Sequence, residues 1–226
     1  MNTDISIIVP CRDEDPSLGK KIEPVIETLS RMKYTHEMIL SCDSTDNRIK
    51  NDIINMRKSN PCIKYVFYAH KKNREDLLLG GLNMASGKYI GFLHHDFSMP
   101  DIYIIAAILD LEKGFDAVIV RRHHSVTDTP LALMRHLASE MINTAYSAWF
   151  RLPRFDYFSP YKFFRRECIL SLANGAKEMA GLSDAHLVAR LCKGQYKMKE
   201  IAGLFLPGHK KGSGAGKASS LSDNNY

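Results

Sequence analysis

The sequence has few cysteines and no close pair of them. Its five cysteines are Cys11, Cys42, Cys62, Cys168 and Cys192. An odd number at wide spacing indicates neither a disulfide framework nor a zinc knuckle, and it favours a reducing compartment. The N-terminus also lacks the charged and apolar regions of a secretory signal, so we expect a cytoplasmic protein.

Long hydrophobic runs are also missing. The longest, Ile102–Leu109, has eight residues, whereas a helix that crosses a bilayer needs about 20. We therefore expect no membrane-spanning helix. Association with the cytosolic face of a membrane remains open.

What the chain does contain is enough apolar sequence for one large domain. Of its 226 residues, 45% are hydrophobic and 25% are charged, which excludes disorder and a stapled mini-protein. Basic residues outnumber acidic ones by 31 to 25, a net charge of +6. This excess suits anionic partners such as nucleotides, lipid phosphates or membrane surfaces. We expect no nucleic-acid partner, because no recognition helix, finger or RNA-binding signature accompanies the charge.

Strand and helix patterns alternate along the chain. Apolar runs predict strands over 5–10, 37–41, 63–68, 88–93 and 117–120, and helical stripes predict helices between them and over 101–112 and 130–150. Pro24 is expected near the first turn of its helix. The alternation predicts right-handed crossovers and a mostly parallel sheet flanked by helices, an α/β fold.

We interpret residues 1–211 as a single domain. Residues 1–100 would form a nucleotide-binding half and residues 101–211 an acceptor-side half. Residues 212–226 are rich in glycine and serine, a composition that predicts a flexible tail.

Polar clusters follow three of the predicted strands, at 12–15, 43–46 and 94–96. Carboxyl ends of parallel strands share one edge of a sheet, where α/β proteins bind ligands. Asp96 is the candidate metal or phosphate-site carboxylate, because Asp101 is better placed to cap the next helix. Strand alternation predicts that His94 and His95 point to opposite sides, so at most one joins Asp96, and a purely structural histidine is an equal alternative.

A second group mixes arginines with aromatic residues between positions 121 and 166. Arginine binds phosphate bidentately and aromatic rings settle at the membrane interface, so the mixture suits a lipid headgroup boundary. An ordinary core with a solvated basic face explains it equally well. The group comprises Arg121, Arg122, Arg135, Arg151, Arg154, Arg165, Arg166, Trp149, Phe150, Phe155, Tyr157, Phe158, Tyr161, Phe163 and Phe164.

Four segments in order resemble a known family. They are Ile7-Ile-Val-Pro-Cys-Arg-Asp-Glu14, Met38-Ile-Leu-Ser-Cys-Asp-Ser-Thr-Asp46, Gly81-Leu-Asn-Met-Ala-Ser-Gly-Lys-Tyr-Ile-Gly-Phe-Leu-His-His-Asp96, and Phe155-Asp-Tyr-Phe-Ser-Pro-Tyr-Lys-Phe-Phe-Arg-Arg-Glu167. The chain resembles the family 2 glycosyltransferases with the GT-A fold. Within them it is most similar to polyprenyl-phosphate sugar transferases of the dolichol-phosphate mannose synthase type.

The resemblance implies a donor site for a UDP- or GDP-sugar. It assigns the nucleotide to Pro10, Arg12, Glu14, Asp43 and His95, and the metal on the donor diphosphate to Asp96 and His94. The family's Asp-x-Asp motif appears here as His94-His95-Asp96. Because imidazole is an acceptable ligand for manganese, this departure favours Mn²⁺ over Mg²⁺. The second segment is one residue shorter than usual around Asp43.

The implied reaction is an inverting sugar transfer, for which the catalytic candidates are Asp96, Asp156 and Arg122. The candidates for binding phosphate or acceptor are Arg135, Arg165, Lys210 and Lys211, with the two lysines closing over the diphosphate. A lipid phosphate acceptor needs no general base, whereas a saccharide or glycolipid hydroxyl would need one, with Asp156 or Asp184 as candidates. Capping a helix is the stronger interpretation for Asp184. A catalytically silent binding protein and a membrane adaptor are the remaining alternatives.

Overall fold

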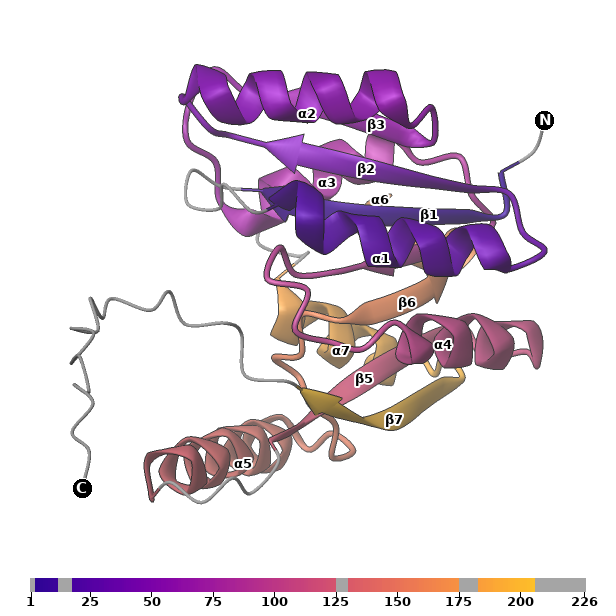
Figure 1. The fold of residues 1–226 in the computed structure, drawn as a ribbon. Coiled ribbons are helices and arrows are strands. Elements are labelled where there is room, and N and C mark those ends of the chain that lie inside the picture. Colours follow the sequence, from indigo (N-terminus) through magenta and orange to yellow (C-terminus); the bar gives the residue numbers. More distant parts are fainter. Residues whose placement is uncertain (1–2, 12–17, 125–129, 175–182, 206–226) are drawn as a thin grey trace, which may run out of the picture.

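The computed structural model describes residues 3–11, 18–124, 130–174 and 183–205 (Figure 1). Within them, seven strands form one sheet in the order β3-β2-β1-β4-β6-β5-β7. Its strands are β1 (Ile5–Cys11), β2 (His36–Cys42), β3 (Ile63–Phe67), β4 (Tyr89–Phe92), β5 (Ala117–His124), β6 (Lys162–Arg165) and β7 (Met198–Phe205). All neighbours run parallel except β6, which is antiparallel to β4 and β5. The predicted α/β fold with a mostly parallel sheet is confirmed.

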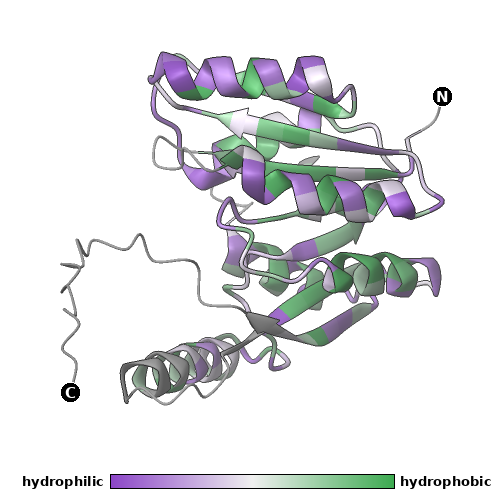
Figure 2. Cartoon of the chain, in the orientation of Figure 1, coloured by the Kyte–Doolittle hydropathy of each residue, from purple (hydrophilic) through white to green (hydrophobic). Residues whose placement is uncertain are grey.

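Helices cover both faces of this sheet, and one further helix, α5 (Pro130–Phe150), lies outside the two layers (Figure 1). The helices of the two layers are α1 (Leu18–Arg31), α2 (Asn47–Ser59), α3 (Arg74–Met84), α4 (Ile102–Glu112), α6 (Arg166–Asn174) and α7 (Asp184–Lys193). One core contains buried residues of α1, α2 and α4, and a second contains those of α3, α6 and α7. Hydrophobic residues, green in Figure 2, gather on the strands and on the sheet-facing sides of these helices.

Strand alternation assigns each side chain of β1 to one of these cores. Ile5, Ile7 and Val9 enter the first core, whereas Ile8 enters the second. All four are fully buried. Apolar residues are needed at consecutive positions because both faces of the strand are covered, which is the pattern expected of a parallel sheet.

Helix α1 differs from the prediction at Pro24. The structure places this proline inside the helix, well beyond its first turn. Pro24 is exposed, so the backbone carbonyl that loses its helical hydrogen bond can be hydrated. Ile22 and Val25 on the other side are buried, and their packing offsets the missing bond.

The amino ends of the strands are held by a buried carboxylate. Glu37 is 3% exposed, and it accepts hydrogen bonds from Ser6 Oγ at 2.6 Å and Ser86 N at 2.7 Å. Lys64 Nζ lies 2.5 Å from its other oxygen. Burial raises the pKa of Glu37, but these bonds outweigh burial and bring the pKa below its usual value. The network therefore joins β1, β2 and β3 at the edge opposite the predicted site.

Candidate functional site

Two of the predicted polar clusters, at 43–46 and 94–96, lie at one edge of the sheet, which we call the carboxyl edge; residues 12–15 lie outside the described residues. Strands β1, β2, β3 and β4 are parallel, and all end there. Because β6 is antiparallel, with Lys162 opposite Phe92, it begins at the same edge. Sequence periodicity did not reveal β6, although it supplies a central part of the site.

The segment after β4 is a tight turn and not an extension of the strand. Phe97 N donates to the His94 carbonyl at 3.1 Å, and Phe97 adopts φ 49°. The rings of His94 and His95 lie side by side, with centroids 4.2 Å apart and planes tilted by 33°. The prediction that these histidines point to opposite sides is therefore wrong, because β4 ends at Phe92 and strand alternation stops with it.

Asp96 is fixed in this turn by three groups. Its Oδ1 accepts hydrogen bonds from the Tyr161 hydroxyl at 2.8 Å and from Ser98 N at 3.1 Å, and it lies 3.1 Å from His94 Nδ1. Burial raises the pKa of Asp96, but the bond and charge of His94, with the other two donors, hold it well below its usual value. Asp96 is thus an ionised carboxylate in a fixed orientation.

Tyr161 is the positioning residue that sequence reasoning missed. Its side chain is 1% exposed, and its hydroxyl also lies 3.1 Å from Ser98 Oγ. Burial and the charge of Asp96 raise the pKa of Tyr161. The phenol therefore stays protonated, and its hydroxyl donates a hydrogen bond to the carboxylate. Tyr161 precedes β6, 65 positions from Asp96. The quoted segment from Phe155 to Glu167 contains it, but nothing in that segment marks it as a partner of Asp96.

Asp96 fits a divalent cation that is held mainly by substrate phosphates. Within the described ranges, no cluster of three or more His, Cys, Asp or Glu side chains could hold a metal. Sites for hard cations on nucleotides often use one or two protein ligands, and the phosphates supply the rest. His94 Nδ1 faces the carboxylate, so its Nε2 points away from Asp96, and His94 would share a cation with Asp96 only after its ring turns.

Asp43 lies at the end of β2, where its side chain is 3% exposed. Its Oδ2 accepts a hydrogen bond from Lys72 N at 2.8 Å, and its own N–H donates to the Cys11 carbonyl at 3.4 Å. These contacts tie the ends of β1 and β2 to the residues before α3. Asp46 is the N-cap of α2 and accepts from Arg48 N.

The other predicted nucleotide residues are placed only in part. Pro10 is buried near the carboxyl end of β1, opposite Ser41 of β2. Arg12 and Glu14 lie outside the described residues. Lys210 and Lys211 also lie outside them, as do the side chains of Arg122 and Arg135.

Asp156, the candidate base in the acceptor-side segment, is buried at 3% exposure. Its Oδ1 accepts from Asn143 Nδ2 at 3.3 Å, and its backbone N–H donates to Glu200 Oε1 at 2.6 Å. Arg121 Nη2 lies 2.7 Å from Glu140 Oε1, and Nη1 lies 3.7 Å from Glu200. Asp156 therefore belongs to a packed polar network that joins α5, β5 and β7.

Arg165 does not lie at the site. It pairs with Tyr89 at the amino end of β4, on the edge opposite Asp96. Its guanidinium donates to the carbonyls of Leu111 and Phe115 at 2.7 and 3.0 Å, at the end of α4. The prediction that Arg165 binds phosphate or acceptor is corrected: its guanidinium is engaged with backbone carbonyls at and just after the end of α4.

Asp184, the other candidate base, is part of an ion-pair group around the buried Lys162 and is itself 18% exposed. Its Oδ1 lies 2.7 Å from Lys162 Nζ, and its Oδ2 lies 3.3 Å from Arg74 Nε. Lys162 is fully buried and also donates to the Ser159 carbonyl. Ser183 and not Asp184 is the N-cap of α7. The expected capping role is thus replaced by a charge contact that joins α7 to β6 and α3.

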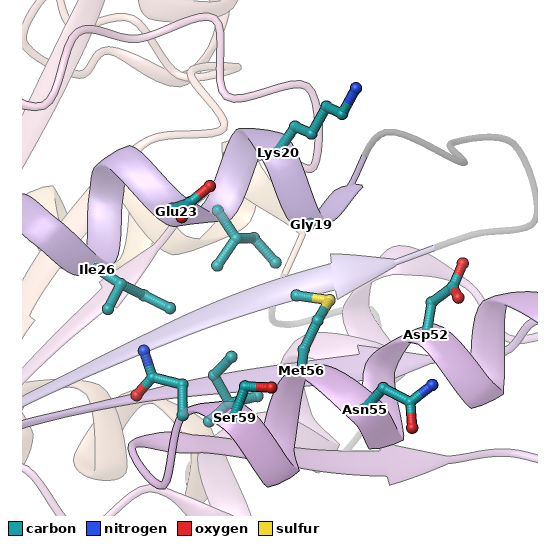
Figure 3. A pocket seen from close by; sticks show the side chains of 11 residues that line it. Gly19, Lys20, Glu23, Ile26, Asp52, Asn55, Met56 and Ser59 are labelled. Atoms are coloured by element: carbon teal, nitrogen blue, oxygen red, sulfur yellow. The ribbon is translucent and has the colours of Figure 1, made fainter.

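A cavity of about 580 Å³ lies between α1 and α2 (Figure 3). Ile22, Ile26, Met56 and Ile63 supply its apolar part, and polar residues such as Asp52 line the rest. Among the residues that the structure describes, none of those predicted for the donor site lines it. The cavity is a groove between two surface helices, and it is separate from the turn that holds Asp96.

Family membership follows from comparison with known proteins. The model of glycosyl transferase family 2 matches residues 6–171, a range that includes Asp43, Asp96 and Tyr161. The chain belongs to glycosyl transferase family 2. An uncharacterised glycosyltransferase of Synechocystis sp. is 25% identical over 129 residues, which cover 57% of this chain and 41% of that protein. This family 2 chain thus spans less than half the length of that relative.

Solved structures share the fold of this family 2 chain. A mannosyltransferase from Pyrobaculum calidifontis, in complex with GDP-Man and Mn²⁺, has a TM-score of 0.62 at 14% identity over 94% of this chain and 59% of its own. Glucosyl-3-phosphoglycerate synthase from Mycobacterium tuberculosis, in complex with phosphoglyceric acid, has a TM-score of 0.63 at 14% identity, over 92% and 73%. The same synthase is also known with Mn²⁺ and UDP-Glc. The chain is therefore a glycosyltransferase-family domain with the fold of enzymes that bind nucleotide sugars.

Proposed function

We propose that the chain is an inverting glycosyltransferase that moves a sugar from a UDP- or GDP-sugar to a polyprenyl phosphate. We propose further that residues 1–211 act as one domain. The observation that carries the proposal is the ionised Asp96, held by Tyr161 and His94 at the carboxyl edge of a family 2 domain. A negative group at this edge suits a cation that bridges protein and donor diphosphate.

On the donor side, Asp96 would hold a divalent cation, and the His94 ring would turn from Asp96 to join it, with Mn²⁺ favoured because imidazole then takes part. The cation would stabilise the negative charge that develops on the departing nucleoside diphosphate. Asp43, oriented by its bond from Lys72 N, would bind the base through its other oxygen, with Pro10 beneath it. Mn²⁺ complexes of the Pyrobaculum and Mycobacterium enzymes support this choice of metal.

On the acceptor side, the arrangement favours an oxygen that is already anionic. Both base candidates are engaged: Asp156 with Asn143, and Asp184 with Lys162 and Arg74. A phosphate oxygen attacks the anomeric carbon without giving up a proton, so it needs no base. The work of the protein is then to orient the acceptor and to stabilise charge on the leaving group. Attack opposite to the leaving diphosphate inverts the anomeric configuration.

A hydroxyl acceptor is the second candidate, and one observation favours it. Burial raises the pKa of Glu200. Its carboxylate accepts a hydrogen bond from Asp156 N and lies 3.7 Å from Arg121 Nη1. A carboxyl group with a raised pKa is the kind of group that accepts a proton from an attacking hydroxyl. Glu200 lies on β7, and sequence reasoning did not identify it.

The donor site is tested first by thermal shift with UDP, GDP, CDP and their sugar conjugates, each with Mn²⁺, Mg²⁺ or chelator. A ligand at one hundred times its Kd stabilises the fold by about 2.7 kcal/mol, which raises Tm by roughly 5 to 10 °C for a domain of this size. We expect Asp96→Asn to lose the metal-dependent shift. Asp116→Asn is the matched control, because Asp116 binds Lys197 N at the opposite edge. No shift with any nucleotide would contradict the proposal.

The acceptor is tested with two lipids that differ in one group. Polyprenyl phosphate and polyprenol of the same length are offered in detergent with the donor found above, and 3-phosphoglyceric acid is offered in parallel. We expect product only from polyprenyl phosphate, with the inverted anomeric coupling in its NMR spectrum. Product from polyprenol that Glu200→Gln abolishes would favour the second candidate. Nucleotide binding without transfer to any of them would indicate a silent binding protein.

A further inference from the structure

Helix α5 presents an apolar face to solvent. Five large side chains are more than half exposed: Met134, Leu137, Met141, Ile142 and Trp149. Trp149 reaches 84%. At 3.6 residues per turn, these five positions fall within one sector about 140° wide. The exposed alanines at 138, 145 and 148 fall in the same sector, and no charged residue interrupts it.

The opposite side of α5 is polar and faces the protein. Asn143 is 4% exposed, and it contacts Asp156 and accepts from Tyr157 N. Glu140 pairs with Arg121 and Arg154 at 2.7 and 2.8 Å. The helix is thus oriented in reverse of an ordinary surface helix, whose apolar stripe faces the core. Its apolar face is not used within the described part of the chain.

This face is too large to be an incidental exposure. Its exposed fractions correspond to roughly 700 Å² of apolar surface, above the 300 to 600 Å² of the largest patch on a typical monomer. Helix α5 also lies apart from the two helical layers, beyond the ends of β5 and β7 (Figure 1). In the part of the chain that the structure describes, no helix is long and apolar enough to cross a membrane.

We infer that the apolar face of α5 docks on the surface of an anionic lipid bilayer. Trp149 ends the face, and Phe150 and Phe158 beside it are about 40% exposed around Tyr146. Aromatic rings of this kind settle at the level of the lipid headgroups. Arg151 follows the helix directly and is exposed, where it can bind lipid phosphate. An apolar face with aromatic and cationic groups at its end is typical of an interfacial helix.

The position of α5 connects this surface to the site. The helix follows β5 at the carboxyl edge, and the chain returns through Asp156 to Tyr161, which binds Asp96. A bilayer on α5 would therefore lie at the carboxyl edge of the sheet, where the proposed donor site is. That the bilayer supplies the acceptor rests on the proposed function, whereas the docking itself rests on α5 alone.

The test uses the full chain and vesicles of phosphatidylcholine with about 30% phosphatidylglycerol. Trp149 is the only tryptophan of the chain, so its emission reports directly on this helix. We expect cosedimentation with the vesicles and a blue shift of Trp149 emission. Leu137→Glu should weaken binding at least tenfold. Leu109→Glu is the matched control, because Leu109 is a similarly exposed leucine on α4, at 43% against 53%.

Three results would overturn the inference. Wild-type protein could stay in the supernatant, Leu137→Glu could bind vesicles as well as wild type, or light scattering could show a dimer that Leu137→Glu dissociates. The last would make the face an interface between two copies. Nucleotide binding measured on the same variants separates the two proposals. Vesicle binding without transfer would refute the proposed function alone, and transfer in detergent without vesicle binding would refute the docking alone.

Discussion

Asp184→Asn should destabilise the protein strongly, because it removes the negative charge beside a buried lysine. Lys162 is fully buried, and its ammonium lies 2.7 Å from Asp184. Burial lowers the pKa of Lys162, and the charge of Asp184 opposes that shift. Without the carboxylate, the chain must either bury an unpaired cation or fold with a neutral lysine, and both cost free energy.

The size of the effect follows from this geometry. Removing one partner of a buried ion pair costs about 3 to 5 kcal/mol. We expect about 3 kcal/mol, the lower end, because the amide oxygen of asparagine still accepts one hydrogen bond. For a domain of this length, Tm should fall by roughly 6 to 12 °C. Lys162→Met should cost less, since Asp184 keeps Arg74 at 3.3 Å.

The assay is a double-mutant cycle in urea, with the wild type, both single variants and the double variant. Asp184→Asn combined with Lys162→Met should recover at least 1.5 kcal/mol, or about half the loss, because no unpaired cation remains. If the free energy of unfolding of Asp184→Asn lies within about 0.5 kcal/mol of the wild-type value, the reasoning is refuted. Unchanged stability with lost turnover would instead identify Asp184 as a base.

Three further predictions follow from the site and the core. Tyr161→Phe removes a bond to Asp96, so Mn²⁺-dependent donor affinity should fall about tenfold in calorimetry; equal affinity would show that the hydroxyl does not position the carboxylate. The pKa of Glu37 is lowered despite burial, chiefly by Lys64, so its stabilisation is present above its unfolded pKa of about 4.5 and is lost as pH falls through the folded value. In urea titrations, Glu37→Gln should therefore make the free energy of unfolding depend less on pH between about pH 3 and 5. The same pH dependence as in the wild type would contradict this. A Cβ on Gly91 would lie 2.7 Å from a side chain of β1 and 2.8 Å from one of β6, so Gly91→Ala should lower stability by about 1 to 3 kcal/mol in the same assay.

Local sequence patterns were sufficient to predict a strand or helix wherever that element is stabilised by its own apolar residues. The run Ile5 to Val9 predicted β1 because both faces of that strand are covered. The N-cap bond of Asp46 is local in the same way, because it reaches only two residues, to Arg48. The helix over 130–150 was predicted with the bounds observed, although its orientation was not.

Long-range contacts were not predictable in the same way. Tyr161 and Asp96 are 65 positions apart, and Arg74 and Asp184 are 110 apart. Nothing in the local sequence around either partner indicates the other. Arg165 was misassigned for the same reason, since only the antiparallel register of β6 places it beside Tyr89 at the far edge.

The sequence by itself determined the alternation of strands and helices, the family, and the location of Asp43 and Asp96 at strand ends. These depend on apolar periodicity and on short motifs, which a chain carries before it folds. Tertiary structure alone decided which groups fix Asp96, which carboxylates are engaged in ion pairs, and which side of α5 faces water. Those outcomes depend on the pairing of β6 between β4 and β5, because one antiparallel strand sets which distant side chains share an edge.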